Sequence, residues 1–166
     1  PGPPFSANVI GRSLPPVASA ASELALDSQL CFALYSASLA MTKLYRPLLA
    51  QIGLTYPQYV VLLALWEYDG LNIAELGERV GLDSGTLTPL LKRMQTQGLI
   101  ERTRSAADER QVLITLTRAG SDLSHAVGAI QEQIACATAC TTRERQNLTQ
   151  SLIDLRTARR GAGTGD

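Results

Sequence analysis

Apolar residues recur at helical spacing along most of the chain. Over 24–51 they return every three or four positions, which predicts one long amphipathic helix that Pro47 bends near its end. A second helix is predicted to follow a cap at Thr55, with Pro57 in its first turn, and to end near Tyr68. Its run VVLLALW is apolar on almost every side, so we expect this helix to be deeply buried.

The pattern then changes to two shorter helices and a β-hairpin. Asn72 is the predicted cap of a helix that Gly81 ends, and Asp83 or Ser84 caps a second helix that Gly98 ends. The β-rich runs LIERTRS and QVLITLT flank the polar loop SAADER, which predicts a hairpin with a long tip. Helix, glycine turn, helix and hairpin is the order of a winged helix-turn-helix.

Two further helices are predicted after the hairpin. Thr117 caps a helix of roughly twenty residues, and Thr141 or Thr142 starts the last one, which ends near Arg159. The predicted fold class is therefore mainly α with a small β-hairpin wing.

Composition changes this picture little. Fifteen Lys and Arg balance fifteen Asp and Glu, so the net charge does not indicate a nucleic-acid partner. The longest apolar run, 59–66, is too short to span a bilayer, and no signal peptide is recognisable, so we expect a cytoplasmic protein with no membrane partner. Segment 1–22 is rich in Pro, Ala and Ser and segment 161–166 reads GAGTGD, which predicts a flexible arm and a disordered tail.

The second short helix carries the residues that suit a DNA groove. Ser84, Thr86 and Thr88 lie in its first turn, where small hydroxyls and free N–H groups can reach base edges or phosphates. Lys92 and Arg93 lie toward its far end and suit backbone phosphates. The residues predicted to hold this helix to the domain are Leu87, Leu90, Leu91 and Met94.

The hairpin adds arginines. Arg102 and Arg104 share one strand face, while Arg110 at the tip can enter a minor groove, with Asp108 holding its guanidinium. Helix-turn-helix geometry also occurs in protein-interaction domains, and scattered arginines are usually solvated surface. The predicted DNA-binding residues are Ser84, Thr86, Thr88, Pro89, Lys92, Arg93, Arg102, Arg104, Asp108 and Arg110.

The segment LNIAELGERVGLDSGTLTPLLKRMQTQGLIERTRSAADERQVLITLTRAG resembles the core of the multiple-antibiotic-resistance regulator (MarR) family, and the likeness spans about 26–158. The resemblance implies a transcription repressor that binds a pseudo-palindromic operator as an obligate homodimer, with half-sites roughly 34 Å apart. It implies a DNA-binding domain over 55–117 and a helical dimerisation region over 23–54 and 118–160.

The first half, LDSQLCFALYSAS and KLYRPLLAQIGLTYPQY, resembles the organic hydroperoxide resistance regulators (OhrR) within that family. Their reactive cysteine is surrounded by tyrosines, and the matching positions here are Cys31, Tyr35, Tyr45 and Tyr56. The thiolate is the form that attacks a peroxide, and tyrosine O–H groups are suitable donors to it. Tyr45 lies roughly 21 Å farther along the same helix than Cys31, so any contact must come from the partner subunit. The alternative is that Cys31 is a small buried hydrophobe and the tyrosines are interface packing.

Cys136 and Cys140 are predicted to lie on one face of the helix after the wing. Some members of the resembled group carry a second cysteine on this helix, which implies Cys136, or alternatively Cys140, as the resolving residue. An organic hydroperoxide would oxidise Cys31 to a sulfenic acid, a disulfide would follow and DNA would be released. Apolar neighbours of Cys31 such as Phe32 and Met41 favour an organic over an inorganic peroxide.

Three other functions remain open. The first is a MarR-type repressor that a small ligand releases without covalent chemistry, the second is a thiol peroxidase, and the third is a redox-insensitive interaction module. His125 is the only histidine and no zinc spacing is present, so we expect no metal, no cofactor and no enzyme.

Overall fold

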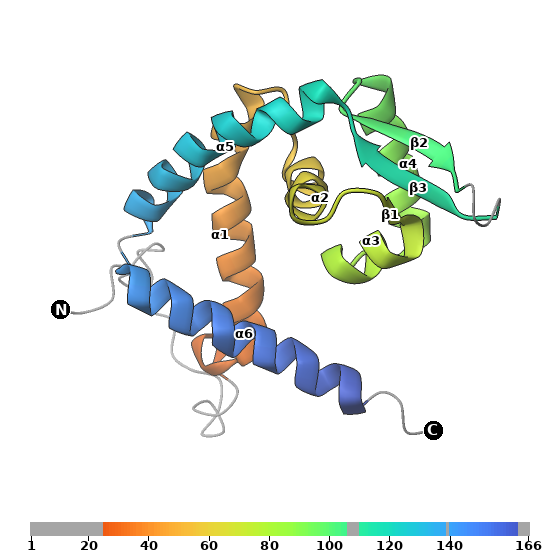
Figure 1. The fold of residues 1–166 in the computed structure, drawn as a ribbon. Coiled ribbons are helices and arrows are strands. Elements are labelled where there is room, and N and C mark those ends of the chain that lie inside the picture. The colour runs from red at the N-terminus through yellow and green to blue at the C-terminus, as the bar shows by residue number, and fades with distance from the viewer. Residues whose placement is uncertain (1–24, 106–109, 139, 163–166) are drawn as a thin grey trace. The chain divides into compact units, whose positions relative to one another are not determined.

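The computed structural model describes residues 25–105, 110–138 and 140–162, with side chains up to residue 158. The chain divides into two units, Pro1–Met41 and Thr42–Asp166, and each is described by itself. The fold is mainly helical with a three-stranded antiparallel sheet (Figure 1), which confirms the predicted class. The predicted arm 1–22 and the last four residues of the predicted tail lie outside the described residues.

The long N-terminal helix starts later than predicted. A single 3₁₀ turn, Leu26–Ser28, comes first, and helix α1 then spans Leu30–Ala50 with Pro47 inside it. Gln29 has extended backbone angles (φ −87°, ψ 116°), so the two pieces are not one helix. Apolar spacing continues across this break, which is why the sequence pattern did not reveal it.

Helix α2 spans Tyr56–Glu67 and lies in the core of the larger unit. Thr55 is its N-cap, and the backbone N–H of Thr55 donates to Oε1 of Gln58 at 2.9 Å, which is half of a capping box. The side chains that α2 buries are Gln58, Tyr59, Val61, Leu62, Ala64 and Leu65. The predicted burial of this helix is therefore confirmed.

The helix-turn-helix follows the predicted caps closely. Helix α3 spans Ile73–Val80 and α4 spans Ser84–Thr96. Gly81 ends α3 with φ +72°, a left-handed conformation that glycine adopts without strain. At the start of α4, Oδ1 of Asp83 accepts the backbone N–H of Thr86 at 2.9 Å, which identifies Asp83 and not Ser84 as the cap.

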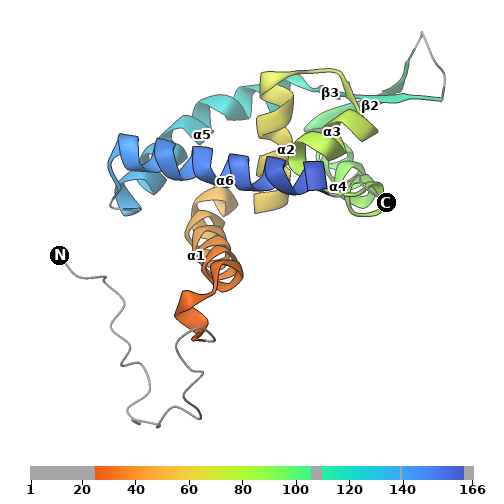
Figure 2. The same cartoon turned by 90° about the horizontal axis from the view of Figure 1, so that it is seen from below.

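The wing is a sheet of three strands in the order β1-β3-β2, with β1 at Leu71–Asn72, β2 at Ile100–Arg104 and β3 at Val112–Leu116. The predicted hairpin is confirmed, because β2 pairs with β3 from Ile100↔Leu116 to Arg104↔Val112. Strand β1 was not predicted, since two residues are too few to show an alternating pattern. Figure 2 shows β2 and β3 side by side, leading away from α3 and α4. The tip residues 106–109 lie outside the described residues.

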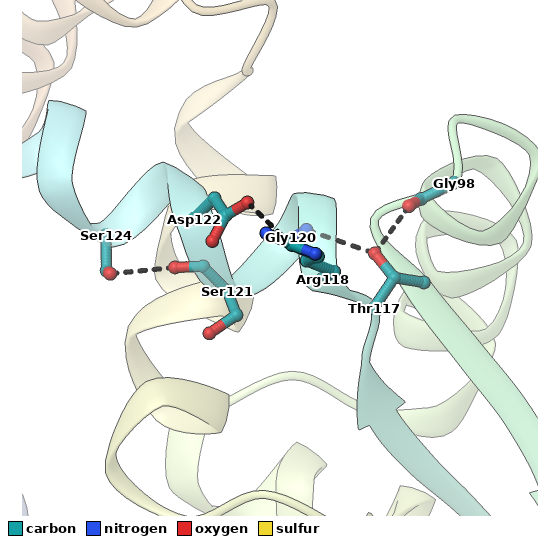
Figure 3. A network of polar contacts seen from close by, with 7 residues as sticks. All are labelled: Gly98, Thr117, Arg118, Gly120, Ser121, Asp122 and Ser124. Carbon is teal, nitrogen blue, oxygen red and sulfur yellow. Dashed lines mark hydrogen bonds and ion pairs between the residues drawn. The ribbon is translucent and has the colours of Figure 1, made fainter.

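Helix α5, Arg118–Ala137, is tied to the wing at its first turn (Figure 3). Oγ1 of Thr117 donates to the Gly98 carbonyl at 2.6 Å and accepts the Gly120 N–H at 3.0 Å. A Cβ atom at Gly120 would lie 2.0 Å from the carbonyl oxygen of Leu99, so only glycine fits there. Trp66 adds a bond from α2, since its Nε1 donates to the Gly120 carbonyl at 3.0 Å.

Helix α6 spans Thr142–Ala162 and so runs three residues beyond its predicted end at Arg159. A capping box starts it: Glu144 accepts the Thr141 N–H at 2.8 Å, and Thr141 Oγ1 accepts the Glu144 N–H at 3.2 Å. The predicted tail from Gly161 is therefore wrong at its first two residues, which continue the helix. None of the helices described is long and apolar enough to cross a membrane.

Candidate DNA-binding surface, tyrosine cluster and cysteines

Helix α4 has one buried and one exposed face. The residues predicted to hold it to the domain are buried, as expected: Leu87, Leu90, Leu91 and Met94. Ser84, Thr86, Pro89, Lys92 and Arg93 are exposed, and Thr88 is half-buried. The exposed face therefore presents small hydroxyls near the helix start and two cations toward its end.

The N-cap residue of α4, Asp83, also forms hydrogen bonds with Thr86, a residue predicted to contact DNA. The Thr86 hydroxyl donates to Oδ2 of Asp83 at 2.8 Å, so its oxygen is left with acceptor capacity toward an incoming group. The backbone and hydroxyl hydrogen bonds from Thr86 hold the pKa of Asp83 below its ordinary value. Asp83 is thus an ionised carboxylate at the positive end of the helix.

The wing arginines differ in exposure. Arg104 and Arg110 are exposed, whereas Arg102 is half-buried and its Nε has no hydrogen-bond partner within the described ranges. Arg102 and Arg104 are two apart on β2 and so share a strand face, as predicted. Asp108, the predicted partner of Arg110, lies outside the described residues.

Two of the three predicted tyrosines come together, and they are joined by one that was not predicted. The ring centroids of Tyr45 and Tyr56 are 5.3 Å apart, and Tyr59 lies 5.4 Å from the first and 5.9 Å from the second. We call Tyr45, Tyr56 and Tyr59 the tyrosine cluster. Burial, with a smaller contribution from the neighbouring Tyr59, raises the pKa of Tyr45 and Tyr56, so both phenols keep their protons at neutral pH.

Tyr59 is buried, and its hydroxyl accepts a hydrogen bond from Nε2 of Gln131 at 3.1 Å. This contact joins the tyrosine cluster, through Tyr59 of α2, to helix α5. Tyr56 and Tyr59 are three apart and therefore share a helix face, a spacing that indicates their pairing. Gln131 lies 72 positions away in sequence, and no local pattern reveals it.

Cys31 and Tyr35 belong to the smaller unit. Cys31 is exposed and is the second residue of α1, so it lies in the first turn of that helix. Tyr35 lies one turn farther along and is also exposed. Free backbone N–H groups and the positive end of the helix dipole surround a residue in this position.

The prediction that Cys136 and Cys140 share one helix face is wrong. Helix α5 ends at Ala137 with Thr138 as its C-cap, so Cys136 lies in its last turn and Cys140 lies in the connection to α6. The capping box at Thr141 starts a new helix here, and this sets where the connection ends. All three cysteines are free and exposed. Within the described residues no group of His, Cys, Asp and Glu is arranged to hold a metal ion.

Comparison with known sequences places this chain among transcriptional regulators. A sequence model described as transcriptional regulator SarA/Rot matches residues 43–127. The HTH-type transcriptional regulator TtmR of Methylorubrum extorquens is 50% identical over 131 residues, 79% of this chain and 67% of that protein. The organic hydroperoxide resistance transcriptional regulator of Bacillus subtilis is 58% identical over 96 residues, 58% of this chain and 65% of that protein. The chain spans about two thirds of the length of each.

Among solved structures, the chain is similar to AbfR of Staphylococcus epidermidis. Reduced AbfR bound to DNA matches with a TM-score of 0.67 and 34% identity, over 82% of this chain and 95% of AbfR. A form of AbfR with a disulfide formed matches with a TM-score of 0.57 and 34% identity, over 84% and 93%.

Proposed function

Because the chain belongs to the MarR/SarA family of winged helix-turn-helix DNA-binding transcriptional regulators, and is similar to the organic hydroperoxide resistance regulators within it, we propose that it is a homodimeric repressor released from DNA when an organic hydroperoxide oxidises Cys31. The family is one of regulators and not of enzymes, so turnover of peroxide is not proposed.

The exposed face of α4 is the single observation that carries the DNA-binding half of this proposal. Its first-turn hydroxyls enter the major groove, and Lys92 and Arg93 meet phosphates. Thr86, whose proton is held by Asp83, accepts from the amino groups that cytosine and adenine present there. Arg110 at the wing enters the adjacent minor groove.

A homodimer is supported by the apolar side chains that the terminal helices leave exposed. Apolar groups in this number are usually covered in the working assembly, and a second copy of the same chain is the commonest cover. Two recognition helices then meet half-sites roughly 34 Å apart on a pseudo-palindromic operator. The exposed residues are Leu26, Leu30, Tyr35, Leu39, Leu148, Leu152 and Ile153.

The sensing half is supported by Cys31, exposed in the first turn of α1, together with the likeness to a hydroperoxide regulator and to AbfR, which is known both reduced on DNA and with a disulfide. Phe32, Leu34 and Met41 are half-buried apolar residues of the same helix and suit the alkyl part of an organic peroxide. The hydroxyls of Tyr35, Tyr45 and Tyr56 donate hydrogen bonds to the thiolate, those of Tyr45 and Tyr56 from the partner subunit.

The proposed chemistry has two steps. The Cys31 thiolate attacks the terminal peroxide oxygen, the O–O bond breaks, and the alkoxide takes a proton and leaves as an alcohol while the sulfur becomes a sulfenic acid. The thiolate of Cys136 then attacks that sulfur, a disulfide forms and the hydroxide leaves as water. Closing the bond requires the two Cα atoms within about 7 Å, which constrains helices α1 and α5 and reorients the recognition helices.

The test uses a duplex enriched by the reduced protein from a random-sequence pool, called here the selected duplex. Wild-type protein is expected to leave it after treatment with cumene hydroperoxide, while the Cys31→Ser protein stays bound. Affinity for the duplex should also fall with rising salt, as phosphate contacts require. Release of the Cys31→Ser protein by peroxide would contradict the sensing mechanism, and salt-independent binding would contradict the DNA contacts.

The resolving cysteine is tested separately. Non-reducing digestion and mass spectrometry of the peroxide-treated protein should show a peptide that links Cys31 to Cys136. Cys140→Ser serves as the matched control and should still form that link. A link from Cys31 to Cys140, or to an external thiol, would replace the proposed pairing.

A second candidate function is release by a small ligand without covalent chemistry. An open cavity of about 380 Å³ lies among α2, α3 and α6, with apolar walls and with Glu67, Arg79 and Arg156 in its lining. Arg79 is paired with Glu67 at 2.7 Å, so Arg156 would meet the carboxylate of a small organic ligand bound there. If a phenolic acid releases the selected duplex from the Cys31→Ser protein, this candidate replaces the redox one.

A further inference from the structure

Gln58 is the only polar side chain buried in the part of the chain that the structure describes, at 4% exposure. A buried amide without partners is costly, so its hydrogen bonds are expected to determine where it lies. Its neighbours in sequence are Pro57 and Tyr59, in the first turn of α2.

Both ends of the Gln58 amide are bonded. Oε1 accepts the backbone N–H of Thr55 at 2.9 Å, and Nε2 donates to Oε1 of Gln97 at 2.6 Å. Because a backbone N–H can only donate, the amide orientation of Gln58 is fixed by chemistry: the oxygen faces Thr55 and the nitrogen faces Gln97.

At one end of this bridge lies the tyrosine cluster. Tyr56 and Tyr59 flank Gln58 on the same helical turn, with ring centroids 5.9 Å apart, and both contact Tyr45. A rigid helical turn carries all three α2 side chains together, so a displacement of the cluster displaces Gln58.

At the other end lies the recognition helix. Gln97 is the C-cap of α4, and its backbone N–H donates to the Arg93 carbonyl at 3.0 Å. The next residue, Gly98, accepts from Thr117 at the start of α5. Gln97 is therefore at the point where the end of the recognition helix, the start of the wing and the start of α5 meet.

We propose that the Gln58–Gln97 hydrogen bond couples the tyrosine cluster to the recognition helix, with Gln58 and Gln97 acting as positioning residues. The inference rests on the proposed function, because it assigns the contact through which a change at the cluster reaches α4. It predicts that removing the bond weakens the effect of peroxide on DNA affinity. The sensor residues and the DNA-binding surface are left in place.

Gln97 is the better site for substitution, because it is exposed and its replacement leaves the α2 capping box intact. Gln97→Ala removes the acceptor, whereas Gln97→Glu keeps a carboxylate oxygen in its place. The measured quantity is the ratio of Kd for the selected duplex after and before cumene hydroperoxide. We expect this ratio to fall about fivefold in Gln97→Ala, the equivalent of one hydrogen bond, and to stay near wild type in Gln97→Glu. Equal ratios in wild type and Gln97→Ala would overturn the proposal, as would equal loss in both variants.

A double-mutant cycle separates this inference from the redox proposal. Tyr45→Leu disturbs the cluster without any peroxide, and its effect on the Kd of the reduced protein is measured with Gln97 and with Gln97→Ala. We expect that effect to shrink at least about threefold in the Gln97→Ala background. The same effect in both backgrounds, or no effect in either, would overturn the coupling. Peroxide-insensitive wild-type protein would contradict only the redox proposal, and the cycle would still decide this inference.

Discussion

Large apolar side chains are buried in the helix-turn-helix region and exposed on the terminal helices. Leu62, Leu87 and Ile114 in the first region are 0% exposed. Leu30 at the start of α1 and Leu148 on α6 are 58% and 60% exposed. The first region completes a core within one chain, and the second presents apolar surface that the proposed dimer would cover.

The two regions also differ in how their elements are held in place. Local hydrogen bonds fix the helix-turn-helix, whereas the terminal helices depend on the proposed partner. In the first region Asn72, Asp83 and Thr117 cap the first turns of α3, α4 and α5, and Thr117 also bonds to the Gly98 carbonyl. Cys31 lies on α1, Cys136 lies on α5 and Cys140 lies in the connection to α6, and the working arrangement of these segments depends on the proposed dimer. In the proposed dimer, the DNA-binding surface is complete within each chain and the sensor is completed by the second copy.

The largest predicted effect is on the dimer dissociation constant and comes from a charge on a terminal helix. Leu148→Glu would place a charge in each half of a two-fold interface, at a cost of about 4 kcal/mol for the two copies, or roughly a thousandfold in the dimer dissociation constant. Sedimentation equilibrium measures this constant. Gln146→Glu, about 200° around the same helix, adds the same charge and should leave the dimer intact. An unchanged constant in Leu148→Glu would mean that α6 is not at the interface.

The next largest effect is on the stability of the fold, at the contact between α5 and the wing. Gly120→Ala should destabilise the fold by about 3 kcal/mol, because its Cβ would overlap the Leu99 carbonyl and separate α5 from the wing. Urea denaturation at one fixed protein concentration measures it. Gly128→Ala on the same helix meets nothing within 4 Å and should be neutral or slightly stabilising. Equal midpoints for the two variants would contradict the close approach.

A smaller loss of stability is predicted when Thr117, the N-cap of α5, loses its hydroxyl. Thr117→Val removes both the bond to the Gly98 carbonyl and the cap on Gly120, and should cost about 1–2 kcal/mol in the same denaturation experiment. Thr117→Ser keeps the hydroxyl and should retain most of the stability. If Val and Ser behaved alike, the network in Figure 3 would not contribute to stability.

The smallest effect concerns pH at the start of the recognition helix. Hydrogen bonds from Thr86 lower the folded pKa of Asp83, so this carboxylate favours the folded state above its ordinary pKa. That contribution is lost as the pH falls through the lowered folded value. In an NMR titration the Thr86 amide proton should shift with a midpoint below the ordinary aspartate value of about 3.9. A midpoint at or above that value would mean that the cap is not formed in solution.

Much of the helix-turn-helix was predictable because its signals are short-range. Asn72 bonds to Glu75 and Asp83 to Thr86, each three residues away, so cap and helix start are encoded within one turn. The exposed and buried faces of α4 follow from helical spacing alone. The same rules misplaced Cys140, because α5 ends at Ala137 with Thr138 as its C-cap and so stops before Cys140.

The order of the helices, most of their caps, the polar face of the recognition helix and the candidate thiols could therefore be predicted from the sequence alone. Which distant residues meet is visible only in the folded chain: β1 pairs with β3, Tyr59 with Gln131 and Gln58 with Gln97. The physical reason is that a cap or an amphipathic face depends on neighbours within one or two turns. A buried hydrogen bond across 39 or 72 positions exists only after the core has brought two elements together.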